Sequence, residues 1–156
     1  MSTLTLGMDS PVLPMVLARE PSAVREEQIR VSVRLALSFN ADTPRRQERR
    51  RSARQLFPHP VRLTPLGRDQ RPLADESIVV IGRHLSEYGL DFYHHEAIPF
   101  RRAVLSIPTD GDEWISLLFE LFWTRYNCHG CYDHGGKFLA VVPSPNLPHL
   151  YGPKSA

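Results

Sequence analysis

The sequence predicts an all-β protein, either an antiparallel barrel or a sandwich, on the basis of three observations. About six short runs of apolar and β-branched residues follow one another after residue 55. Turn residues separate these runs roughly every ten positions, a spacing typical of antiparallel sheets. The chain also contains 14 prolines in 156 residues, which disfavours long helices.

Residues 1–44 are predicted to form an N-terminal extension of the domain. Residues 1–23 show no sustained periodicity, so we expect a flexible lead-in. Residues 29–39 alternate six apolar side chains with mostly polar ones, which is the pattern of a strand with one buried face. The Glu26-Glu27-Gln28 segment favours a helix just upstream, but the alternation favours a strand over 29–39. This strand would join the sheet or pack on its outside.

The remaining predicted strands lie between Leu56 and Val142. The run from Trp114 to Tyr126 is nearly all apolar and could form a helix, but its aromatic and β-branched members favour a strand. Residues 128–136 are expected to connect a hairpin, and 144–156 to form an irregular tail. The predicted strands cover 61–66, 77–83, 90–93, 102–107, 114–126 and 137–142.

An arginine-rich block, residues 45–55, stands before the first of these strands. The net charge is only +2, yet six of the 17 arginines fall between Arg45 and Arg54. Arginine presents a planar fork of donors that matches phosphate oxygens and base edges, so the block indicates recognition of an anion. Having no apolar face, it is expected to be mobile until something binds. Composition alone favours a solvated charge run or a nonspecific nucleic-acid contact over a specific site.

A second polar segment, His84-Leu85-Ser86-Glu87-Tyr88-Gly89, lies where one predicted strand ends and the next begins. Ser86 supplies a small hydroxyl close to the turn. Gly89 has no Cβ, so that backbone or ligand can approach closely, and it can adopt positive φ. Taken alone, the segment is more typical of an ordinary strand connection.

Together the two segments resemble the PilZ family. That family has an Arg-x-x-x-Arg entry segment, here Arg50 to Arg54, and an [Asp/Asn]-x-Ser-x-x-Gly motif about thirty residues later. The resemblance covers residues 45–143 and implies a six-stranded antiparallel PilZ-like β-barrel that binds the bacterial second messenger cyclic di-GMP. It implies that Arg50 and Arg54 contact phosphate and guanine, with help from Arg51. Binding would order the entry segment and so transmit the signal.

The chain departs from this pattern at His84, where the family has Asp or Asn. The resemblance implies that His84 takes the base-reading position and that Ser86 and Gly89 form the pocket floor. A carboxylate accepts two hydrogen bonds from a guanine edge, whereas a neutral imidazole has one acceptor. Losing a bidentate base contact costs about 1–3 kcal/mol, so a live site predicts tighter binding in the variant His84→Asp.

Two alternatives to a receptor remain open. A barrel of the same fold without nucleotide could act as a protein-interaction module for an unknown partner, or the arginine block could bind nucleic acid, which is the less favoured alternative. No nucleophile–base arrangement indicates an enzyme. Cys128 and Cys131 have the Cys-x-x-Cys spacing of zinc ligands, and His94, His95 and Glu96 could be imagined as their partners. No second pair of ligands with such spacing is evident, however, so neither a metal nor a cofactor is predicted. We see neither a signal peptide nor a membrane span and expect a cytoplasmic protein.

Overall fold

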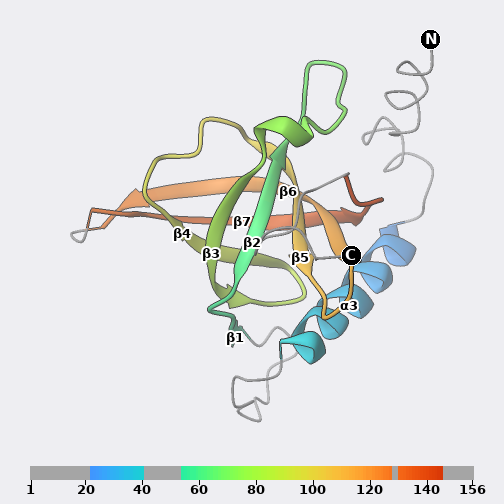
Figure 1. Cartoon of the computed structure of the whole chain (residues 1–156). Helices are drawn as coiled ribbons and strands as arrows, with labels where there is room; N and C mark the ends of the chain where they lie inside the picture. Colours follow the sequence, from blue (N-terminus) through green and yellow to red (C-terminus); the bar gives the residue numbers. More distant parts are fainter. Residues whose placement is uncertain (1–21, 41–53, 128–129, 146–156) are drawn as a thin grey trace.

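The fold is a closed six-stranded antiparallel β-barrel with one short strand outside it and one N-terminal helix, in a computed structural model that describes residues 22–40, 54–127 and 130–145 (Figure 1). Strand order is β1-β3-β2-β5-β6-β7-β4, and pairing of β3 with β4 closes the barrel. The all-β barrel prediction is therefore confirmed. The elements are α3 (Ser22–Phe39), β1 (Gln55–Leu56), β2 (Pro60–Pro65), η1 (Ala74–Glu76), β3 (Ile78–Leu85), β4 (Gly89–His94), β5 (Arg102–Pro108), β6 (Trp114–Tyr126) and β7 (Tyr132–Val141).

The apolar residues of these strands form the barrel core. Every strand pairing in the barrel is antiparallel. Because the barrel is closed, each of the strands β2 to β7 is paired on both sides. Phe92, Phe119 and Phe138 lie in contact near the centre, with ring centroids about 6 Å apart. The run 114–126 is strand β6, as its aromatic and β-branched residues predicted.

The prediction of a strand over 29–39 is wrong, because these residues belong to the helix α3. Its buried residues are Ile29, Val33 and Ala36, which are spaced as one helical face. Val31 and Leu35, which the alternation would have buried, are 45% and 47% exposed. The helix lies outside the barrel against β7 and β6, so that its buried face joins the barrel core (Figure 1).

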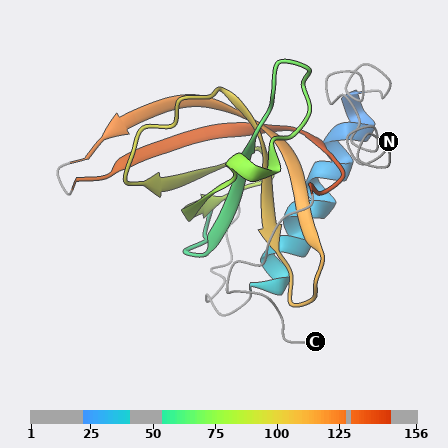
Figure 2. The same ribbon diagram turned by 45° about the horizontal axis from the view of Figure 1, so that its top comes forward.

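Strands β6 and β7 form a long hairpin that extends beyond the other strands (Figure 2). Strand β7 begins at Tyr132, so the predicted connection 128–136 is too long by five residues. The flexible lead-in 1–21, the arginine block up to residue 53 and the tail from residue 146 lie outside the described residues. In the described part of the chain no helix is both long and apolar enough to cross a membrane.

Candidate functional site

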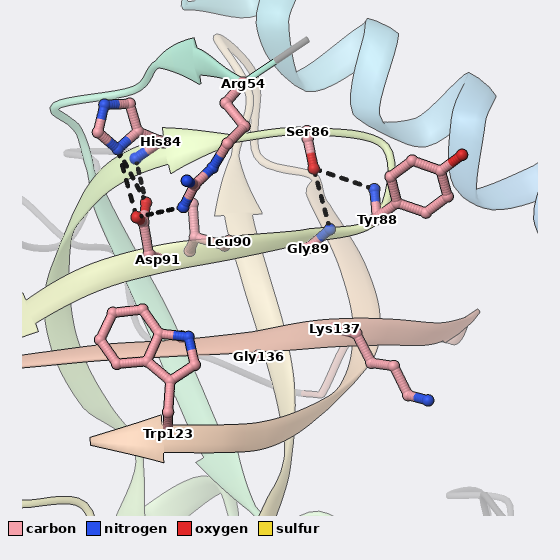
Figure 3. A pocket seen from close by; sticks show the side chains of 11 residues that line it. Arg54, His84, Ser86, Tyr88, Gly89, Leu90, Asp91, Trp123, Gly136 and Lys137 are labelled. Carbon is pink, nitrogen blue, oxygen red and sulfur yellow. Dashed lines mark hydrogen bonds and ion pairs between the residues drawn. The ribbon is translucent and has the colours of Figure 1, made fainter. Parts of the chain in front are cut away.

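A pocket of about 140 Å³ opens on the outer surface of the barrel where β3 turns into β4 (Figure 3). A register shift between Gly82 and His84 places an extra residue in β3, and His84 then pairs with Asp91 across the two strands. Such a bulge re-aims the side chains that follow it. The same alternation that buries Leu90 and Phe92 in the core turns Asp91 to the outside, where the pocket lies.

The carboxylate of Asp91 is the central acceptor of the pocket. Its Oδ1 accepts the backbone N–H of His84 at 2.7 Å, and its Oδ2 accepts Nη2 of Arg54 at 2.8 Å. The His84 ring also lies against it, with Nδ1 3.2 Å from Oδ1 and 3.3 Å from Oδ2. Asp91 is only 7% exposed, whereas the Arg54 side chain is 64% exposed. The carboxylate is therefore buried at the base of the pocket, and the guanidinium pairs with it from the solvent side.

Ser86 organises the turn between the two strands. Its Oγ accepts the backbone N–H groups of Tyr88 at 3.2 Å and Gly89 at 3.4 Å, and its own N–H donates to the Gly89 carbonyl at 3.0 Å. Because the oxygen serves as acceptor for the turn, the hydroxyl hydrogen can be donated to a ligand.

Close backbone packing explains the glycine at position 89. A Cβ built on Gly89 would lie 1.9 Å from the carbonyl oxygen of Gly136 on the paired strand β7. Among the described residues positive φ occurs at Gln70 and Gly130 and not at Gly89. Close approach is therefore the reason for this glycine.

The far wall of the pocket comes from the β6–β7 hairpin and carries Trp123, Gly135, Gly136 and Lys137 (Figure 3). The Trp123 ring lies flat against Gly135, where a Cβ would come within 2.3 Å of it. The residue as a whole is 40% exposed. Lys137, one of two lysines in the chain, also lines the pocket, and its Nζ lies over the Phe122 ring at 4.9 Å from the centroid. Arg54 and Lys137 together outnumber the single carboxylate of the lining. The pocket therefore combines an aromatic surface with an excess of positive charge.

The helix α3 contacts the turn of the pocket. Arg30 of the helix lies 3.5 Å from the Glu87 carboxylate and also pairs with Glu27 one helical turn before it. Glu87 stands between Ser86 and Tyr88, which line the pocket. The N-terminal extension, to which the sequence assigned no role, thus touches the segment that carries the second motif.

Four of the six predicted site residues line this one pocket: Arg54, His84, Ser86 and Gly89. Arg50 and Arg51 lie outside the described residues. Asp91 was missed, although a charged residue between Leu90 and Phe92 inside an apolar strand is an available signal, since buried carboxylates are rare unless paired. Tyr88, Trp123 and Lys137 were also not predicted as site residues. Tyr88 lies inside the second motif, whereas Trp123 carries no local sequence signal.

Comparison with known proteins adds little to this geometry. No family model matches the chain, and no curated protein sequence does. Among solved structures, the apo state of MrkH from K. pneumonia is similar to 70% of this chain at 14% identity and a TM-score of 0.36. The matched part spans 47% of MrkH, so this chain covers less than half of that protein's length. At this TM-score the likeness supports no argument about function.

Proposed function

We propose that this protein is a non-enzymatic receptor for cyclic di-GMP. One observation carries the proposal: Arg54 and the residues His84, Ser86 and Gly89, which the sequence pattern singled out some thirty positions apart, line a single pocket. The pairing of β1 with β3, in which Gln55 lies opposite Leu85, brings Arg54 to the strand end that carries the second motif. The resemblance of the two segments to the PilZ motifs supplies the identity of the ligand.

The pocket chemistry fits a cyclic dinucleotide. The Arg54 fork matches phosphate oxygens or the O6/N7 edge of guanine. The partly exposed Trp123 offers a face on which a purine can stack, an interaction of about 1–3 kcal/mol per base. Lys137 adds positive charge for the phosphates.

Asp91 supplies the acceptor that position 84 lacks. In the free protein its oxygens are occupied by Arg54 and by His84. When Arg54 turns to a ligand phosphate, Oδ2 regains an acceptor position, and the carboxylate can accept from the N1–H and N2–H₂ edge of guanine. Ligand binding would then separate the Arg54–Asp91 ion pair and give each partner a new one.

The pocket size fits one part of the ligand. A volume of about 140 Å³ is below the roughly 300–1,000 Å³ typical of complete small-molecule sites. It would take one guanine or one phosphate. Arg50 and Arg51 precede Arg54 by four and three residues in the sequence. Arg50 and Arg51 are therefore proposed to contact the remainder of the ligand.

Calorimetric titration of the full chain with cyclic di-GMP at moderate salt tests this function. We expect saturable binding that weakens about 10–100-fold in Arg54→Ala, since a charged bidentate contact is lost. The matched control is Arg68→Ala, which removes an exposed arginine that does not line the pocket. Absence of heat at high micromolar ligand would refute the receptor and favour a protein-interaction barrel. Binding of single-stranded oligonucleotides that falls equally in both variants and steeply with salt would favour nucleic-acid recognition.

The variant His84→Asp sharpens the role of Asp91. From the sequence alone this change should tighten binding by restoring an acceptor. With Asp91 paired directly opposite, the new carboxylate would face an existing one and repel it. We therefore now expect binding no tighter than that of the natural chain, measured in the same titration. Tighter binding would show that Asp91 does not read the base.

A further inference from the structure

A cluster of metal-ligating side chains lies at the opposite end of β4 from the pocket. Strand β4 ends at His94, which pairs with Tyr132, and the chain bends at the next two residues. On a straight strand, neighbouring side chains point to opposite faces. Here the bend instead brings one ligand atom from each of His94, His95 and Glu96 within 4.8 Å of the others.

The distances within the cluster are compatible with one shared ion. The rings of His94 and His95 have centroids 4.4 Å apart, and His95 Nε2 lies 3.8 Å from Glu96 Oε1. Ligand atoms at about 2.0–2.2 Å from a tetrahedral zinc ion lie about 3.4 Å from one another. Closing the cluster therefore needs small side-chain rotations, and His95 and Glu96 can make them because they are 73% and 76% exposed.

The backbone beneath the cluster is anchored by a buried histidine. His134 on β7 is fully buried and stacks on Phe92 with ring centroids 5.1 Å apart. Its Nδ1 lies 2.9 Å from Thr124 Oγ1, and its Nε2 lies 3.4 Å from the carbonyl oxygen of Glu96. His134 therefore contacts the bend from the barrel side and is not one of the three clustered ligands.

We propose that His94, His95 and Glu96 bind a divalent transition-metal ion, with Zn²⁺ as the first candidate. Two imidazole nitrogens and one carboxylate oxygen are a ligand set that suits Zn²⁺, Cu²⁺ or Ni²⁺, whereas Mg²⁺ and Ca²⁺ prefer all-oxygen surroundings. Three protein ligands leave a fourth position for water or for an external donor. The site shares no residue with the nucleotide pocket, so it stands or falls independently of the proposed function.

The nearby cysteine offers the competing explanation of any zinc binding. Cys131 directly precedes Tyr132, the residue paired with His94, and it is half-buried with a free thiol. It does not belong to the cluster of close ligand atoms found among the described residues. The variant Cys131→Ser therefore separates a histidine–glutamate site from a thiolate site.

The test is calorimetric titration of the metal-stripped, tag-free full chain with ZnCl₂, and with MgCl₂ for ion selectivity. We expect one equivalent of Zn²⁺, no Mg²⁺ heat, and affinity reduced at least about tenfold in both His95→Ala and Glu96→Gln. Cys131→Ser and Glu76→Gln, which changes an exposed acid elsewhere, should bind as the natural chain does. The Co²⁺ derivative should show no thiolate charge-transfer band.

Four outcomes would overturn the proposal: no zinc binding at millimolar concentration, unchanged affinity in His95→Ala, unchanged affinity in Glu96→Gln, or loss of binding in Cys131→Ser. Circular dichroism of each variant checks the fold. Since His95 and Glu96 are exposed, their substitution is expected to leave the spectrum unchanged.

Discussion

The two ends of strand β4 carry two polar clusters that are built in opposite ways. At the Gly89 end a tight turn pairs β3 with β4, so polar side chains from different strands meet across the sheet. At the His94 end the strand bends, so three consecutive side chains converge along the chain. The first cluster surrounds a carboxylate that is 7% exposed. In the second, His94 is half-buried, whereas His95 and Glu96 are more than 70% exposed.

This difference separates a preorganised site from an adaptable one. Asp91 is held by a backbone N–H and a neighbouring ring, so that a ligand meets an acceptor already in position. His95 and Glu96 must lose rotameric freedom when they close on an ion, which reduces affinity. Substitutions of Gly89 or Asp91 should therefore reduce the stability of the fold. Substitutions of His95 or Glu96 should reduce only metal binding.

The largest effect is expected at the Gly89 end, from Gly89→Ala. The added Cβ would lie 1.9 Å from a backbone oxygen of β7, so the paired strands must separate. We expect a loss of about 3 kcal/mol in the free energy of unfolding, measured with urea. Gly111→Ala is the matched control, because its Cβ would meet nothing closer than 3.8 Å. Equal stability of the two variants would contradict the packing argument.

The next effect is stabilisation of the fold by zinc at the His94 end of β4. Zn²⁺ at about 100 times its dissociation constant should raise the free energy of unfolding by about 2.7 kcal/mol. The double variant His95→Ala/Glu96→Gln should match the natural chain without metal and gain nothing with it. A thermal melt with and without Zn²⁺ measures both. Stabilisation of the double variant would place the ion elsewhere.

A smaller effect distinguishes the two partners of the central ion pair. Asp91→Ala leaves the His84 backbone N–H without its acceptor and should cost about 2 kcal/mol of stability. Arg54→Ala should cost under about 1 kcal/mol, because that side chain is largely exposed. Urea unfolding of both variants checks the difference. Equal losses would mean that the ion pair, and not the backbone contact, stabilises the turn.

The smallest effect concerns pH at the His94 end, in metal-free protein. Burial lowers the pKa of His134, and His94 lowers it further, while the contact with Glu96 and the charge of Asp133 oppose this. The unfolded state therefore binds a proton first as pH falls, and stability should decline below about pH 6.5. One such group gives a slope of at most about 1.4 kcal/mol per pH unit. Urea midpoints from pH 7.5 to 5 should fall less in His134→Asn than in the natural chain.

The barrel was predicted correctly from the sequence and the helix α3 was not, because local patterns do not show what a segment packs against. Residues 61–142 show apolar runs between turn residues. This local pattern is enough to predict the barrel strands, since most consecutive strands pair with one another. In residues 29–39 a period of two is superimposed on a helical face, since Ile29 and Val33 satisfy both. The small Ala36 falls on the mostly polar face of the predicted strand, yet it is fully buried. Burial against the barrel, which no local pattern records, decides in favour of the helix.

The candidate site was predictable only where a motif marks it. Ser86 and Gly89 act on their own turn, so neighbouring residues reveal them. Trp123 and Lys137 reach the pocket through the pairing of β6 and β7 with β4, and this register depends on irregularities near Leu121 and Trp123 that the sequence does not announce. Asp91 was partly predictable. A charged residue inside an apolar strand is unusual and marks the position, but its partners depend on the bulge in β3, which the sequence does not show.

The position of Trp123 in the pocket gives the protein a built-in optical probe. The chain has two tryptophans, and both belong to β6. Trp114 starts that strand and Trp123 lies nine residues further on, up to about 30 Å away at 3.3 Å per residue. A base stacked on the Trp123 indole would alter its emission while Trp114 stays unaffected. The unlabelled chain thus reports ligand binding through Trp123, over a constant contribution from Trp114.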